Sequence, residues 1–212
     1  MQLTKQQIDY CMECGVCTGS CPISQERAGF SPRQMIKRTL VETDENVLYS
    51  NDLWACLSCS RCSDRCPVGI DFPEFIRSYR QQARAVANLP RESHHGVFQT
   101  LSTLQAGASR LNRIAWTEGA GQIAAKGDYF YFVGCAPFQT PVFKYLGLNV
   151  IDTAKNILKL INAVGIVPVV SNDERCCGHD AFWAGNEELF AALARKNVET
   201  IVASGAKTVI FG

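Results

Sequence analysis

The sequence predicts two domains of different fold class, an α-helical cysteine-rich domain followed by an α/β domain with a parallel, Rossmann-like sheet. Two cysteine runs of the pattern CxxCxxCxxxCP lie in the first part of the chain. The 34 residues between them lack the alternation of a β-strand and read as helix and loop. After residue 128, short apolar runs alternate with helix-length amphipathic segments, which is typical of a parallel sheet covered by helices.

The two runs hold eight of the eleven cysteines. Three thiolates of a CxxCxxC segment can converge on one iron–sulfur cube, while the fourth cysteine, held off by proline, reaches a different cluster. The runs therefore predict two [4Fe-4S] clusters with exchanged ligands. One set is Cys11, Cys14, Cys17 and Cys66, and the other is Cys56, Cys59, Cys62 and Cys21.

Two structural zinc sites are the main alternative for these cysteines. Zinc usually takes four ligands from separated CxxC or Cys/His pairs rather than from a triple run, so the pattern favours clusters. A disulfide framework is disfavoured because such close neighbours would need distant partners. The long helical connection between the runs favours a helical ferredoxin over a compact ferredoxin built on β-hairpins.

Composition and charge exclude several classes of function. The 212 residues include 21 basic and 20 acidic side chains, for a net charge of +1, which gives no electrostatic basis for binding nucleic acid or an anionic membrane. The sequence has no apolar stretch of membrane-spanning length and no signal-peptide core at its start. We therefore expect a cytoplasmic protein, in the compartment that keeps cluster-binding thiolates reduced.

Capping residues mark the helices expected in the first domain. Ser31 followed by Pro32 starts one between the runs, Ser50 or Asn51 starts a short one before Cys56, and Asp71 starts one after the second run. A short helix over Leu3–Tyr10 is also expected. The side chains expected to face the core are Met35, Ile36, Leu40, Leu53, Trp54, Phe75, Ile76, Tyr79, Ala83 and Val86.

The other face of the helix after Asp71 carries Arg77, Arg80 and Arg84. A basic stripe beside a cluster could dock an acidic partner and stabilise the reduced cluster. Surface charge at helical spacing is ordinary, however, so the pattern favours a solvated helix face.

The second half begins with an interrupted helical stretch over Val97–Ile114 and a glycine-rich boundary over Glu118–Asp128. Strands are expected at Tyr129–Val133, at Ile166–Val170 despite Pro168, and at Thr208–Phe211. Helices are expected from Asp152 to Gly165 and from Asn186 to about Ser204. The first of these should bury Ile157, Leu158, Leu160, Ile161 and Val164. We divide the chain into residues 1–95, a helical linker over 96–127, and residues 128–212.

The three remaining cysteines follow predicted strands. Cys135 comes after the first strand, and Cys176 and Cys177 come after the second. Because parallel strands end at one rim of a sheet, these thiols could converge there. From the residues alone, a metal site and a set of incidental thiols, or a strained vicinal disulfide, are equally good interpretations.

Longer motifs resemble one known family. The two runs with the ending CPVGIDFPEF resemble the helical ferredoxin subunit of heterodisulfide reductase, and YFVGCAP with DERCCGHDAFWAGN resembles the CCG-domain subunit of the same enzyme. The fused arrangement is also similar to the iron–sulfur subunits of glycolate oxidase, anaerobic glycerol-3-phosphate dehydrogenase and the membrane-complex protein of sulfate reducers.

The resemblance implies a third redox site. In that family a lone cysteine, a CC pair and a CxxC pair hold a non-cubane [4Fe-4S] cluster that reduces disulfides, and Cys135, Cys176 and Cys177 match the first three positions. The CxxC pair has no counterpart among these residues. We expect it directly after Gly212 in a longer polypeptide, where it would complete the third cluster.

The resemblance and the cysteine runs lead to one main hypothesis. The chain would be an electron-transfer subunit of an oxidoreductase complex, carrying electrons between a flavoprotein or iron–sulfur partner and the CCG site; attachment to a membrane would be only peripheral, through a partner. Alternatives are catalytic disulfide reduction at Cys135, Cys176 and Cys177, a dehydrogenase iron–sulfur subunit, and an iron–sulfur redox sensor. A sensor would need an output module, and no recognition helix is visible.

Overall fold

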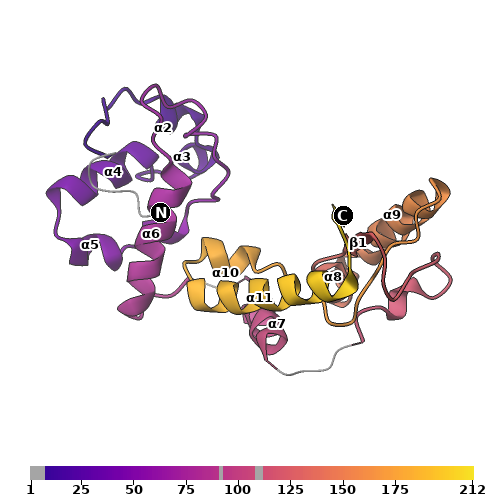
Figure 1. Ribbon diagram of the computed structural model, residues 1–212. Helices are drawn as coiled ribbons and strands as arrows, with labels where there is room; N and C mark the ends of the chain where they lie inside the picture. Colours follow the sequence, from indigo (N-terminus) through magenta and orange to yellow (C-terminus); the bar gives the residue numbers. More distant parts are fainter. Residues whose placement is uncertain (1–7, 91–92, 108–111) are drawn as a thin grey trace. The chain divides into compact units, whose positions relative to one another are not determined.

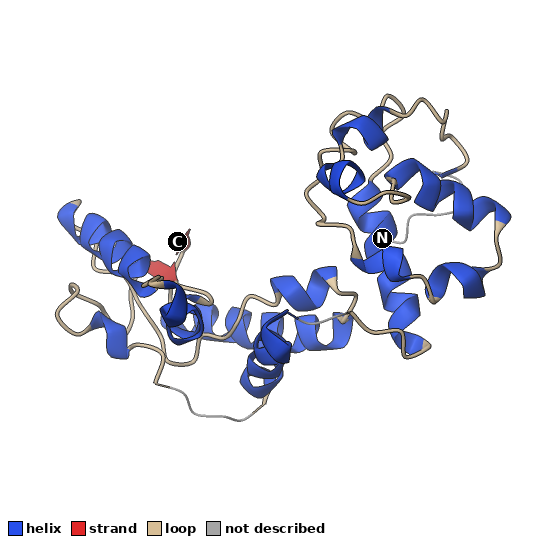
Figure 2. Ribbon diagram, turned by 180° about the vertical axis from the view of Figure 1, so that it is seen from behind, coloured by secondary structure: helices blue, strands red, loops and turns tan. Residues whose placement is uncertain are grey.

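The computed structural model describes residues 8–90, 93–107 and 112–212. The chain divides into two compact units, Met1–Ser93 with Asp180–Glu187, and His94–His179 with Glu188–Gly212. Helices make up most of the regular structure, and the strands form one small sheet (Figures 1 and 2). The helix expected over Leu3–Tyr10 lies mainly outside the described residues.

Short helices build the first unit, and three of them start at predicted caps, namely Ser31, Ser50 and Asp71. The Ser31 Oγ accepts a hydrogen bond from the Gln34 N–H, and the Asp71 Oδ1 accepts one from the Glu74 N–H. In each case proline follows in the first helical turn, where its missing N–H costs nothing. The elements are α2 (Val16–Ser20), α3 (Pro22–Glu26), α4 (Pro32–Val41), α5 (Asp44–Leu48), the 3-10 turn η1 (Asn51–Trp54) and α6 (Phe72–Ala85).

An apolar core joins these helices and supports the cysteine runs. Met35, Leu53, Phe75 and Ile76 are almost completely buried, as the helical spacing predicted. Six of the eight run cysteines belong to this core or pack against it: Cys11, Cys17, Cys21, Cys56, Cys62 and Cys66. Two predicted core positions were wrong, because Leu40 and Val86, at the ends of their helices, are exposed.

The interpretation of the α6 arginines as a solvated or docking face was wrong for Arg77 and Arg80. Both guanidinium side chains are buried. Arg77 forms ion pairs with Glu74 and Glu187 and lies over the ring of Phe182. These last two partners come from the segment Asp180–Glu187, which belongs to the same compact unit although it is more than one hundred residues away in sequence.

The second unit is built around a two-stranded parallel sheet. Strands β1 (Tyr129–Phe132) and β2 (Thr208–Phe211) pair in register from Tyr129 with Thr208 to Phe132 with Phe211. The other elements of this unit are η2 (Ser93–Gly96), α7 (Val97–Ala106), η3 (Ala115–Thr117), α8 (Ala136–Phe143), η4 (Lys144–Leu146), α9 (Ile151–Ala163) and α11 (Glu187–Ser204), whereas α10 (His179–Trp183) lies almost entirely in the segment Asp180–Glu187 of the first unit. Thus both predicted outer strands and both predicted long helices are present.

The predicted strand Ile166–Val170 forms only isolated bridges. Val169 pairs with Phe130 on one side and Ala124 on the other, whereas Pro168 has no N–H to donate to a ladder. Helix α9 also differs from its prediction: it begins at Ile151, and its buried residues include Leu158 and Ile161. Leu160 and Val164 instead face solvent. Within the described residues, no helix combines the length and apolar character needed to cross a bilayer.

Candidate metal centres

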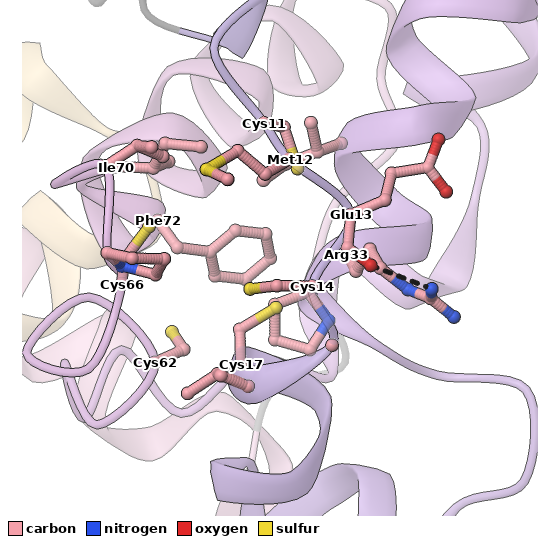
Figure 3. A pocket seen from close by; sticks show the side chains of 16 residues that line it. Cys11, Met12, Glu13, Cys14, Cys17, Arg33, Cys62, Cys66, Ile70 and Phe72 are labelled. Atoms are coloured by element: carbon pink, nitrogen blue, oxygen red, sulfur yellow. Dashed lines mark hydrogen bonds between the residues drawn. The ribbon is translucent and has the colours of Figure 1, made fainter.

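A cavity in the first unit gathers all three leading cysteines of the first run. Cys11, Cys14 and Cys17 line it together with Cys66, the fourth cysteine of the second run, and with Cys62. Figure 3 shows these side chains around the ring of Phe72. The wall is otherwise mainly apolar, with contributions from Met12, Val16, Pro32, Ile36, Pro67, Val68 and Ile70.

A second cavity repeats this arrangement with the roles of the runs reversed. Cys56, Cys59 and Cys62 line it together with Cys21, the fourth cysteine of the first run. Each run therefore contributes its last cysteine to the cavity of the other, as exchanged ligation requires. Only Cys62 among the described cysteines lines both cavities.

The two loops also share an unusual backbone. Glu13 and Gly15 flank the middle cysteine of the first run with φ of 50° and 80°, and Ser58 and Ser60 occupy the corresponding positions of the second run with φ of 52° and 62°. Non-glycine residues adopt this left-handed conformation at a cost and cluster at functional sites. The repetition at matched positions indicates that both loops surround the same kind of bound group.

The chemistry of the two cavities fits iron–sulfur clusters. Each offers at least four thiols in a largely apolar wall, which suits a sulfur-ligated cube better than a hydrated ion. Burial raises the pKa of Cys17 and Cys56, and it raises the pKa of Cys62 to about 11. Without metal these thiols therefore hold their protons, and cluster binding must displace them.

A third group of thiols lies in the second unit. The sulfur atoms of Cys135, Cys176 and Cys177 lie within 4.8 Å of one another, and the Cys135 and Cys176 sulfurs are 3.5 Å apart. Cys135 lies shortly after β1, and the pair follows the extended segment that contains Val169. No disulfide joins Cys176 to Cys177, so the vicinal disulfide considered from sequence is not formed. The three thiols, called here the cysteine trio, do converge.

Glycine is required directly after the cysteine pair. Gly178 has φ of 81°, and a Cβ atom at this position would lie 2.8 Å from the Phe190 ring. The same tight turn brings the Gly178 N–H within 3.5 Å of the Cys176 sulfur. The turn thus fixes the orientation of the buried thiol.

A buried polar network supports the trio from behind. The Gln105 side-chain oxygen accepts hydrogen bonds from the Cys176 N–H at 2.8 Å and from Arg113 at 2.8 Å. Arg113 forms an ion pair with Glu174 at 2.9 Å, and both side chains are 2% exposed. The Glu174 carboxylate also accepts the N–H of Gly134, the residue before Cys135. One series of contacts therefore connects the two segments that carry the trio.

Sequence reasoning missed this network. Glu174 lies two residues before the cysteine pair and could have been noticed, because a carboxylate so close to a predicted strand end needs a partner if it is buried. Nothing in the local pattern of Gln105 or Arg113 indicated a role, since their contacts are long-range. Ser102 and Asn197, which hydrogen-bond to Cys176, gave no local signal either.

Hydrogen bonding distinguishes the three thiols electrostatically. Contacts from the thiols of Cys135 and Cys177, with further donors at Gly178 and Ser102, lower the pKa of Cys176. The hydrogen bond to Cys176 in turn raises the pKa of Cys135. The Cys176 sulfur also accepts hydrogen bonds from outside the trio, from the Gly178 N–H at 3.5 Å and the Ser102 hydroxyl at 3.6 Å, and these favour its thiolate, the form that binds metal or attacks a disulfide.

Comparison with known proteins agrees with both halves of this description. Residues 7–70 match the family model of a 4Fe-4S dicluster domain, and residues 129–212 match that of a cysteine-rich domain. The chain is similar to heterodisulfide reductase iron–sulfur proteins. Over 97% of its length it is similar to one subunit of the dihydromethanophenazine:CoB–CoM heterodisulfide reductase of Methanosarcina acetivorans, with 27% identity over 54% of that protein.

Other heterodisulfide reductase-like relatives match a shorter stretch of the chain. One subunit of the H2/formate:CoB–CoM heterodisulfide, ferredoxin reductase of Methanococcus maripaludis is 38% identical over 38% of the chain and 43% of its own length. One subunit of the ferredoxin:CoB–CoM heterodisulfide reductase of Methanosarcina acetivorans is 40% identical over 36% of the chain and 30% of its own length. The chain thus spans about half the length, or less, of these curated relatives.

Proposed function

We propose that this chain transfers electrons as an iron–sulfur subunit of a heterodisulfide reductase-like complex, between a flavin or iron–sulfur partner and the cysteine trio. One [4Fe-4S] cluster would be held by Cys11, Cys14, Cys17 and Cys66, and the other by Cys56, Cys59, Cys62 and Cys21. When bound, such clusters accept and release single electrons. The need for reduced thiols favours a cytoplasmic location.

The observation that carries this proposal is the exchange of fourth cysteines between two apolar cavities. An incidental pair of zinc knuckles has no reason to place Cys66 beside the first run and Cys21 beside the second. The matched left-handed residues support the same assignment, because they give both loops the same curvature. The similarity to the dihydromethanophenazine-linked relative over nearly the whole chain supports the combination of two clusters with a cysteine trio in one polypeptide.

Reciprocal variants test the ligand assignment. After anaerobic reconstitution we expect about eight irons and eight sulfides per chain in the two runs. Cys21→Ser should damage the cluster of the second run, and Cys66→Ser that of the first, as followed by electron paramagnetic resonance. If each variant instead damages the cluster of its own run, the exchange is wrong. Bound zinc without iron–sulfur absorption would contradict the whole proposal.

A second candidate function is disulfide reduction at the trio itself. Its support is the convergence of three thiols with Cys176 set up as the thiolate. The reaction would break one S–S bond of the substrate with two electrons from the reduced partner and two protons, giving two thiols. Cys176→Ser should abolish disulfide turnover but leave both clusters of the first unit reducible. Unchanged turnover in this variant would eliminate the candidate.

A further inference from the structure

Arg80 is a buried guanidinium whose hydrogen-bond partners are carbonyl and hydroxyl oxygens, and it lies over the Trp54 ring at 5.5 Å from the ring centroid. Only 6% of the residue is exposed. It donates to the carbonyl oxygens of Leu53 at 2.8 Å, Cys56 at 2.7 Å and Trp183 at 2.9 Å, and its Nη1 lies 3.4 Å from the Ser58 hydroxyl. Across the described ranges no ion pair includes Arg80, whereas Arg77, one turn earlier, has two carboxylate partners.

A buried charge normally requires an opposite charge nearby. Arginine cannot escape this requirement by losing its proton, since its pKa lies far above neutrality. Arg80 lies directly against the second cysteine run, because its Nη2 donates to the carbonyl oxygen of Cys56 at 2.7 Å. The burial of Arg80 is therefore explained if its counter-charge is the anionic iron–sulfur cluster held by Cys56 and its neighbours.

We propose that Arg80 raises the reduction potential of the cluster assigned to Cys56, Cys59, Cys62 and Cys21. Reduction adds one electron, supplied by the partner, to an assembly that is already negative. A fixed positive charge beside it stabilises the reduced form more than the oxidised form, and burial weakens the screening by water. Arg80 does not ligate the cluster, so its role is to set the potential. The inference rests on the ligand assignment proposed above.

The segment Asp180–Glu187 helps to exclude water from the Arg80 guanidinium. Its Trp183 carbonyl oxygen accepts a hydrogen bond from Arg80, and its Glu187 accepts bonds from Arg77 and from Gln81. Gly185 lies directly against α6, because a Cβ atom there would overlap the Gln81 nitrogen and lie 2.8 Å from the Arg80 carbonyl carbon. Replacing Gly185 by alanine should therefore displace the segment and admit water while leaving Arg80 in place.

A redox titration followed by electron paramagnetic resonance tests the proposal. Arg80→Met removes the charge, Arg80→Lys keeps it, and Arg84→Met removes the same charge one turn further along α6. A Cys59→Ser variant identifies the signal of the second-run cluster, and the other cluster serves as the internal reference. At the wild-type midpoint we expect the ratio of reduced to oxidised cluster to fall about tenfold in Arg80→Met, which is 59 mV for one electron. A unit charge about 12 Å away at an effective dielectric constant of about 20 gives an effect of this size.

The proposal predicts a near-wild-type ratio in Arg80→Lys and Arg84→Met and a smaller fall in Gly185→Ala. If Arg80→Met binds less iron than the wild type, the reduced-to-oxidised ratio of Gly185→Ala is the deciding measurement instead. Full iron content with an unchanged ratio in the deciding variant would overturn this inference and leave the proposed function standing. A wild-type chain without cluster signals would overturn the proposed function, and this inference with it.

Discussion

Replacing Glu174 by glutamine should destabilise the buried polar network that supports the cysteine trio. The carboxylate accepts three hydrogen bonds, from Arg113 at 2.9 Å, the Gly134 N–H at 2.7 Å and the Val133 N–H at 3.1 Å. An amide has a single acceptor oxygen, so its NH2 group would face at least one of these donors. It would also leave the Arg113 charge buried without a counter-ion. Breaking a buried pair in this way costs about 3–5 kcal/mol, a large part of the stability of an ordinary domain.

Hydrogen–deuterium exchange of the β1 amides measures this effect locally. A loss of about 3–5 kcal/mol corresponds to roughly two to four orders of magnitude in protection. Asp128→Asn is the matched control, because it breaks an ion pair with Lys207 whose side chains are 63% and 78% exposed, and such pairs contribute little. The double variant with Arg113→Met should lose less protection than Glu174→Gln alone, since it leaves no unpaired charge. A loss below tenfold in Glu174→Gln would refute the reasoning.

Three further results are expected. Chelation of iron should unfold the cluster loops while the second unit keeps its exchange protection; equal losses in both units would contradict this. Gly178→Ala should cost about 1–3 kcal/mol by forcing the Phe190 ring away, measured by urea unfolding. Gly205→Ala, with similar φ but open space, should cost less. Burial raises the pKa of Tyr131 to about 12, above the ordinary value near 10. The stability that its phenol contributes is therefore complete below pH 10 and lost as pH rises toward 12, and Tyr131→Phe should lack this decline.

The elements that could be predicted from sequence are those set by local chemistry. Ser31 and Asp71 cap helices because their oxygens reach an N–H three residues ahead. Tyr129–Phe132 and Thr208–Phe211 form strands because their aromatic and β-branched side chains favour the extended backbone of a sheet. The convergence of the cysteine trio was a correct option, although the residues alone left incidental thiols equally open.

The predictions failed where tertiary partners decide the outcome. Arg80 follows the spacing of a surface residue, and nothing within its own helix indicates that the Trp183 carbonyl oxygen will cover it. In the same way, Gln105 reaches Cys176 across 71 residues of sequence. The strand expected around Pro168 failed for a local reason that was visible, because a residue without an N–H cannot continue a ladder on both sides.

The chain enters the first compact unit twice, once through Met1–Ser93 and again through Asp180–Glu187. This route makes the cluster-binding half a poor candidate for dissection by a single cut. A fragment that stops near residue 93 would lack Glu187 and the Trp183 carbonyl, and two arginines of α6 would lose acceptors that they have in the full chain. A fragment of this half should therefore carry Asp180–Glu187 as a grafted segment, or be studied together with a synthetic peptide of that sequence. Only then can a spectroscopic property of the fragment be attributed to the whole protein.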